Sequence, residues 1–178
     1  MAKSSENPRH YKLVTRACFL LFILAMLALY GQVDLYRATF ISPFISAGIM
    51  IVAGLLFTLL LRKRLAPYFA TRSFPLHLLY HSLTAGSFVL FLLMWLNFHN
   101  HGTSQKVHTP IISKGNLSKG KYGSCARPYI RIKYKGHKKQ VVLNCNDRTE
   151  MYNSTDLTIA KGMLGFEVIL GVELVYDF

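Results

Sequence analysis

Charged side chains are absent from long parts of this chain. Residues 40–61 and 76–98 contain no Asp, Glu, Lys or Arg, and residues 17–36 contain only Asp34, at their far end. A bilayer-spanning helix needs roughly 20 mostly apolar residues, and each of the three runs reaches that length. Helices that pack in the core of a soluble protein keep a polar face, which these runs lack. The sequence therefore predicts three transmembrane helices.

Catalytic motifs are also missing. The chain contains no Gly-x-Ser-x-Gly nucleophile motif, no His-Glu-x-x-His zinc motif and no Gly-rich phosphate loop. The acids and histidines that follow residue 98 are scattered and show no paired spacing. We therefore expect a protein that is not an enzyme and that holds no cofactor.

Ionisable groups inside the apolar runs are scarce, which argues against the usual transport and proton-relay proteins. The candidates are His77 and His81, with Asp34 at an outer edge. The two histidines are four residues apart and share one helix face, so they could ligate a metal or haem, although a closed site needs more ligands. Two alternatives stay open: a haem- or metal-binding subunit of a membrane redox complex, and a small transporter or channel.

The basic residues near the ends of the runs predict the orientation of the chain. The tail, residues 1–16, and the loop at 62–75 each carry four Lys or Arg, whereas the loop at 37–39 carries only Arg37. Because Lys and Arg are enriched on the cytoplasmic side, the N-terminus is predicted inside and the C-terminal part outside. No cleavage site follows the first run, so we expect a retained anchor. The predicted location is a bacterial inner membrane.

Cysteine is rare, with Cys18 in the first run and Cys125 and Cys145 in the C-terminal part. The last two flank a predicted hairpin, formed by strands at 129–134 and 140–144. Cross-strand neighbours approach within disulfide range, so a Cys125–Cys145 bridge is predicted. Such a bridge persists in an oxidising compartment, and the alternative is two free thiols in a reducing cytosol.

Beyond residue 98 the pattern is typical of short strands. Apolar and basic residues alternate at 129–134, and further strands are predicted at 107–112, 157–160 and 166–176. Pro110 favours an edge position for the first of these, because proline cannot donate to a ladder. The predicted fold is a membrane α + β protein: a cytoplasmic tail (1–16), three transmembrane helices (17–98), and a small antiparallel β domain (99–178), as a sandwich or partial barrel.

Charge divides the predicted β domain into two halves. Residues 106–139 contain ten Lys or Arg and no acid, whereas residues 147–178 contain six acids and two basic residues. The basic half could bind an acidic protein or an anionic partner of the cell envelope. The alternative is a solvated face that protects an edge strand from aggregation. The possible anionic-partner patch comprises Arg127, Arg131, Lys133, Lys135, Lys138 and Lys139.

Nucleic acid is not expected as a partner, because the strands lack the exposed aromatic residues that stack on bases. Small residues at 42–54 and 84–87 predict close packing of the helices, and a homo-oligomer in the lipid bilayer is possible. Together these observations predict a small, non-enzymatic membrane protein whose extracytoplasmic β domain binds a protein or an anionic envelope partner, in an accessory, sensor or protective role.

Overall fold

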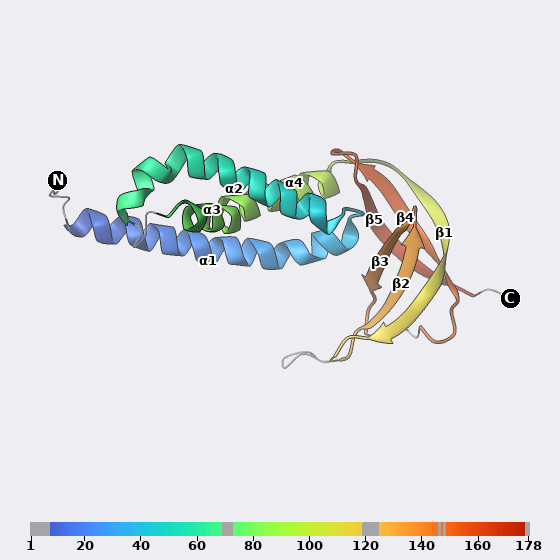
Figure 1. Cartoon of the computed structure of the whole chain (residues 1–178). Helices are drawn as coiled ribbons and strands as arrows, with labels where there is room; N and C mark the ends of the chain where they lie inside the picture. The colour runs from blue at the N-terminus through green and yellow to red at the C-terminus, as the bar shows by residue number, and fades with distance from the viewer. Residues whose placement is uncertain (1–7, 69–72, 119–124, 146, 148, 177–178) are drawn as a thin grey trace. The chain divides into compact units, whose positions relative to one another are not determined.

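The structure is a computed structural model that describes residues 8–68, 73–118, 125–145, 147 and 149–176. It contains three helical segments long and apolar enough to cross a membrane, Tyr11–Ala38, Pro43–Leu65 and Phe74–His99. A five-stranded antiparallel sheet follows them along the chain (Figure 1). The predicted fold class, three spanning helices followed by an antiparallel β module, is confirmed.

The first two predicted spans are single helices, α1 (Pro8–Ala38) and α2 (Pro43–Leu65), and the short turn η1 (Ala66–Tyr68) follows α2. The third is divided at Thr84 into α3 (Phe74–Leu83) and α4 (Ala85–His99). The Thr84 hydroxyl donates to the carbonyl oxygen of Tyr80 at 2.8 Å, and the Ser87 hydroxyl to that of Leu83 at 2.5 Å. Hydroxyl side chains that bond the carbonyl four residues back are often found where helices bend.

Small residues bring α2 close to the third span, as the sequence predicts. A Cβ atom added at Gly54 would lie 2.5 Å from Cα of Ser82, and one added at Gly86 would lie 2.6 Å from the carbonyl oxygen of Met50. Neither space admits a larger side chain. In lipid, where apolar surface gives helices no reason to associate, such close backbone approach is a main source of packing energy.

The chain forms two compact units. The helical unit comprises Met1–Val33 and Ser42–Leu93, and the β unit comprises Asp34–Ile41 and Met94–Phe178. The β unit therefore includes the last turn of α1 and the connection to α2. We call the segment Asp34–Ile41 the connector.

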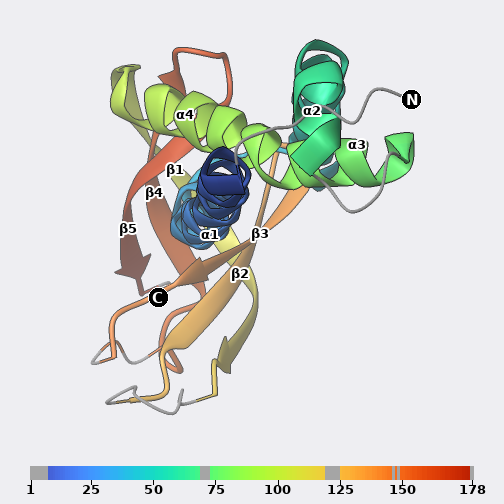
Figure 2. The same cartoon turned by 90° about the vertical axis from the view of Figure 1, so that its left-hand side faces the viewer.

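The β unit contains β1 (His101–Asn116), β2 (Pro128–Tyr134), β3 (His137–Val142), β4 (Ser154–Gly162) and β5 (Glu167–Val175). Their order across the sheet is β3-β2-β1-β4-β5, and every neighbouring pair is antiparallel. The views in Figures 1 and 2 show that the sheet is strongly curved. Curvature turns one face inward, where the core forms.

The long strand β1 is central, so the predicted edge position of residues 107–112 is wrong. Its first part pairs with β4 as far as Pro110↔Ser154, and its last part pairs with β2 from Ile111↔Ile132 onward. Ile111 donates its N–H to Asn153, so the neighbouring Pro110 directs its nitrogen away from β4. Pro110 has no pairing residue on β2, so the N–H that proline lacks removes no hydrogen bond from the sheet.

The β2–β3 hairpin has a shorter turn than the sequence predicts. Tyr134 pairs with His137, and Lys135 and Gly136 alone form the turn. Their φ angles are +46° and +82°, the left-handed pair that a tight two-residue hairpin requires. The Cys125–Cys145 disulfide joins the chain just before β2 to the chain just after β3, with Cα atoms 6.0 Å apart. The predicted bridge is therefore present.

The core of the β unit lies on the inner face of the curved sheet. Ile130 and Ile132 of β2, and Leu157 and Ile159 of β4, are fully buried there. The connector contributes Phe40, which packs in the same cluster. Its backbone also joins the sheet, because Thr39 forms an antiparallel bridge with Val168 and Phe40 donates its N–H to Glu167 at 2.8 Å.

Candidate functional site

The six residues of the predicted patch fall into different environments, and Lys139 is the one that is buried. Its exposed fraction is 9%. Its Nζ donates to the carbonyl oxygen of Tyr36 at 2.6 Å and lies 4.2 Å from the centroid of the Tyr36 ring. Burial lowers the pKa of Lys139 to about 8. Lys139 therefore ties the connector to β3, within the β unit, and is not available to a partner.

Lys135 is neutralised by an acid. Its Nζ donates to a carboxylate oxygen of Glu167 at 2.5 Å, and this hydrogen bond raises the pKa of Lys135. Two further pairs join a basic side chain to a carboxylate in the same way: Lys106 with Glu173 at 2.9 Å, and His108 with Asp156 at 2.7 Å. In each pair a basic residue of the first half of the β unit meets an acid of the second half.

Three members of the patch share the outer face of the β2–β3 hairpin. Arg131, Lys133 and Lys138 are all exposed, and Lys133 lies directly opposite Lys138. We call these three residues the basic face. Like charges placed opposite one another on neighbouring strands destabilise the pairing. Among the described residues no acid lies within salt-bridge distance of the three.

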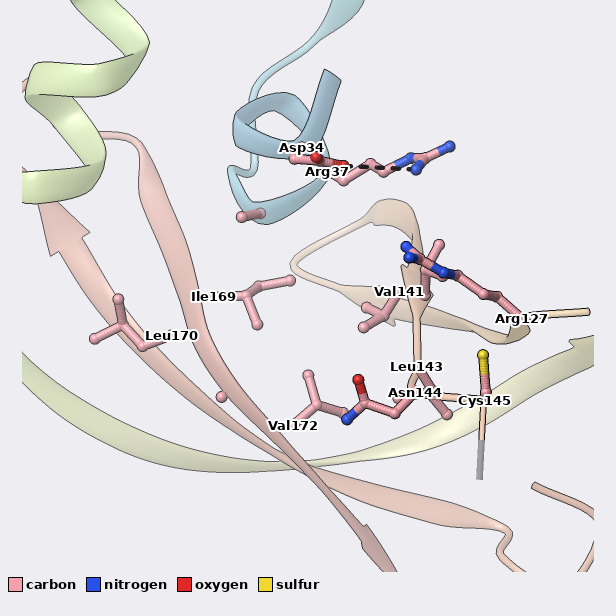
Figure 3. Close-up of a pocket in the computed structure, with 13 residues that line it drawn as sticks. Asp34, Arg37, Arg127, Val141, Leu143, Asn144, Cys145, Ile169, Leu170 and Val172 are labelled. Atoms are coloured by element: carbon pink, nitrogen blue, oxygen red, sulfur yellow. Dashed lines mark ion pairs between the residues drawn. The ribbon is translucent and has the colours of Figure 1, made fainter. Parts of the chain in front are cut away.

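A cleft lies in the β unit between the two edges of the sheet, with a volume of about 430 Å³. Residues 141–145 at the end of β3 form one wall, and residues 169–172 of β5 form the other. Figure 3 shows Val141 and Ile169 pointing toward each other across it. The remaining wall residues are Asp34, Arg37, Ala38 and Arg127. We call this space the edge cleft.

The charged side chains of the edge cleft are predominantly basic. Arg37 lies 3.7 Å from Asp34 in an exposed pair, so Asp34 only partly offsets its charge. Arg127 adds a second guanidinium, which Figure 3 shows on the same side of the cleft as that of Arg37. Guanidinium groups bind carboxylates through paired hydrogen bonds. The cleft thus combines apolar side chains, strand edges and two groups suited to an anion.

Sequence reasoning selected Arg127 for the site but used Arg37 only to predict orientation. The reason is that Arg37 lies about ninety positions before Arg127 in the sequence, and nothing in the pattern joins them. The participation of Thr39 and Phe40 in the sheet was missed for the same reason. The one local indication is that threonine and phenylalanine are residue types that favour strands, and a pair of residues is too short to predict one.

The two histidines of the third span lie in the helical unit, and Asp34 belongs to the β unit. His77 and His81 are buried, with ring centroids 6.4 Å apart. Within the described ranges no group of three or more His, Cys, Asp or Glu side chains could hold a metal ion. The part of the chain that the structure describes thus brings no third residue of these types to the pair.

The helical unit contains a larger cavity of about 530 Å³. His81 and Thr84 contribute to its wall, but leucine, valine, alanine and phenylalanine side chains make up most of it. Among the described residues that line it, Arg64 is the one that carries a charge. We therefore take the β unit, where exposed cations and strand edges meet, as the candidate site.

Comparison with families of known proteins, with curated proteins and with solved structures found no match for this chain.

Proposed function

We propose that this protein is a non-enzymatic membrane protein that binds an acidic partner protein through its β unit. Its three helices would anchor it in a bacterial inner membrane, with the N-terminus in the cytoplasm and the β unit on the opposite side. The observation that supports binding is the basic face, in which Arg131, Lys133 and Lys138 have no acidic neighbour among the described residues.

The contrast with the rest of the sheet favours a partner over a merely solvated surface. Elsewhere in the β unit Lys106 and Lys135 are matched by Glu173 and Glu167. On the basic face, by contrast, Lys133 and Lys138 oppose each other directly. A surface that only needs to stay soluble can alternate its charges and avoid this repulsion. An acidic partner would relieve the repulsion on binding.

The disulfide and the distribution of basic residues support the location. A bridge such as Cys125–Cys145 is typical of oxidising compartments, which in a bacterium lie outside the cytoplasm. The N-terminal tail and the 62–75 loop, which share one side of a three-span protein, carry most of the basic residues near the spans.

Binding of a polyglutamate chain to the full protein in nanodiscs tests the proposal. We expect Lys133→Gln to weaken binding by about 1.4- to fivefold, because an exposed charge contact contributes about 0.2–1 kcal/mol. Lys161→Gln is the matched control, since Lys161 is exposed on β4, away from the basic face. It should change affinity less than Lys133→Gln. Equal effects of the two variants, or no binding by the unaltered protein, would contradict the proposal.

A further inference from the structure

The two edge strands of the sheet run in the same direction. In the order β3-β2-β1-β4-β5 all four neighbouring pairs are antiparallel. Every second strand therefore runs the same way, so β3, β1 and β5 are parallel to one another. The edges of β3 and β5 also line the same cleft. One extra strand, antiparallel to both, would therefore complete an all-antiparallel arrangement around the core. Two edges that face one cleft offer backbone groups on both sides of such a strand.

The chain itself shows that the edge of β5 accepts an antiparallel strand. Thr39 forms an antiparallel bridge with Val168, and the N–H of Phe40 bonds the carbonyl oxygen of Glu167 at 2.8 Å. This contact covers only the beginning of β5. From Ile169 to Val172 the same strand lines the edge cleft instead.

The register of the hairpin identifies the backbone groups that β3 offers. A two-residue turn makes Tyr134 and His137 a hydrogen-bonded pair, so the pairing alternates along the strands from there. Leu143 donates its N–H to the carbonyl oxygen of Pro128 at 2.9 Å, in agreement with that alternation. Gln140 and Val142 then fall at the positions between bonded pairs. Their N–H and C=O groups point away from β2, toward the open edge.

The charge of the cleft determines the kind of strand that would bind. Arg37 and Arg127 line it, and Lys138 is exposed on β3. A segment with Asp or Glu side chains would place carboxylates near these cations. At about 3.4 Å per residue, the four residues 169–172 extend over roughly 14 Å, so a pairing of four or five residues fills the wall.

We propose that the edge cleft binds an extended acidic segment of a partner protein by strand addition between β3 and β5. This inference rests on the proposed function and specifies how the partner is held. Backbone hydrogen bonds to Val142 and Gln140 hold the segment, and Arg37 and Arg127 bind its carboxylates. The basic face of the same hairpin attracts the acidic region around the segment.

Peptide binding to the full protein in nanodiscs tests strand addition directly. The probe is a fluorescent ten-residue peptide of alternating Glu and Thr, blocked at both ends. A second probe carries N-methyl groups on alternate residues, which removes the N–H donors from one edge of the peptide. A third replaces every Glu by Lys. We expect the first probe to bind, the N-methylated one to bind at least tenfold more weakly, and the Lys probe to show no saturable binding.

A substitution in β3 tests the same contact from the side of the protein. Val142→Pro removes one outward N–H and leaves the ladder to β2 intact, and proline is tolerated on edge strands. We expect it to weaken binding of the Glu peptide at least tenfold. Val142→Ala keeps the N–H and should weaken binding by twofold at most. Hydrogen exchange at Gln140 and Val142 should slow when the peptide is added to the unaltered protein.

Four outcomes would overturn strand addition. If N-methylated and unmodified peptides bind equally, the backbone of the segment is not recognised, whether or not Val142→Pro folds. If polyglutamate binds and the short peptide does not, the basic face acts without the cleft, and only the proposed function survives. If Val142→Pro dissociates a dimer of the unliganded protein, the cleft holds a second copy of this chain. If no acidic probe binds, the proposed function fails as well.

Discussion

At the scale of single residues, Lys139 shows that a sequence pattern does not separate a buried structural lysine from an exposed one. Its neighbours in the sequence, Lys138 and Gln140, are both polar, and nothing in the pattern sets it apart from an exposed lysine. In the structure, however, its ammonium group is buried against Tyr36. A buried lysine usually costs stability, but here a carbonyl oxygen and an aromatic ring compensate in part. Lys139 and its Tyr36 partner thus belong to the architecture of the β unit.

The buried lysine predicts a specific dependence of stability on pH. The pKa of Lys139 is about 8 in the folded protein, below the ordinary value of 10.5. Between these values the unfolded chain binds the proton that the folded chain has lost, so the free energy of unfolding rises with pH in that range. We expect a rise of up to about 3 kcal/mol relative to Lys139→Met.

Urea unfolding followed by pulse proteolysis of the detergent-solubilised protein, at about pH 7.5 and about pH 10, measures this difference. Comparison with Lys139→Met cancels the titration of all other groups. If both proteins show the same change with pH, the ammonium group of Lys139 is not buried in solution.

At the scale of elements, the sequence predicts what depends on local pattern. Alternation identifies β2, the apolar runs identify the three spans, and the cysteines on either side of the hairpin identify the disulfide. The position of β1 was not predictable in this way. Pro110 excludes a backbone donor, but it does not say on which side of the strand the donor is missing. Only the change of partner, from β4 to β2, makes proline harmless in a central strand.

The candidate site was predictable to a similar extent. Period-two alternation correctly indicates that Arg131 and Lys133 share an outer face. The alternation cannot indicate that Lys135 forms an ion pair with Glu167, because the two are 32 residues apart in the sequence. Nor can it indicate the edge cleft, which exists only because the sheet curves and brings β3 near β5.

The hairpin turn carries a prediction about glycine. Gly136 has a φ of +82°, a conformation that side-chain-bearing residues rarely adopt. We expect Gly136→Ala to lower the free energy of unfolding by about 1–2 kcal/mol, the cost of a left-handed residue with a Cβ atom. Urea unfolding of the detergent-solubilised protein, followed by pulse proteolysis, measures this loss of stability.

Gly102→Ala provides the control. The φ of Gly102 is not positive, and an added Cβ would meet nothing closer than a carbonyl oxygen of Lys161 at 3.9 Å. Its effect should stay within about 0.5 kcal/mol. If the two alanine variants lose the same stability, the turn does not hold Gly136 in the left-handed region.

At the scale of the whole molecule, the predicted orientation can be tested with the native cysteines. In a Cys18→Ser background, only Cys125 and Cys145 can react with a maleimide. We expect both to be labelled in intact spheroplasts by a membrane-impermeant maleimide, but only after an impermeant reductant has opened the disulfide. An external reductant reaches the bridge because the β unit is predicted to lie outside the cytoplasm.

Labelling that occurs only in inverted vesicles would contradict the predicted orientation. Labelling that needs no reductant would contradict the bridge. Replacing Cys125 by Ser leaves one reactive thiol and controls for the efficiency of each reagent. The same variant separates the two conclusions, because its single thiol reports the side of the membrane regardless of the bridge.

The connector has a consequence for how the protein is made. Phe40 is synthesised about sixty residues before β1 begins, and two predicted spans separate them along the chain. The core of the sheet needs Phe40, so translation must pass both spans before the sheet can close around it. A gene fragment that begins at residue 99 would encode every strand and still omit a core side chain. Membrane insertion and sheet formation are therefore successive steps of one assembly process.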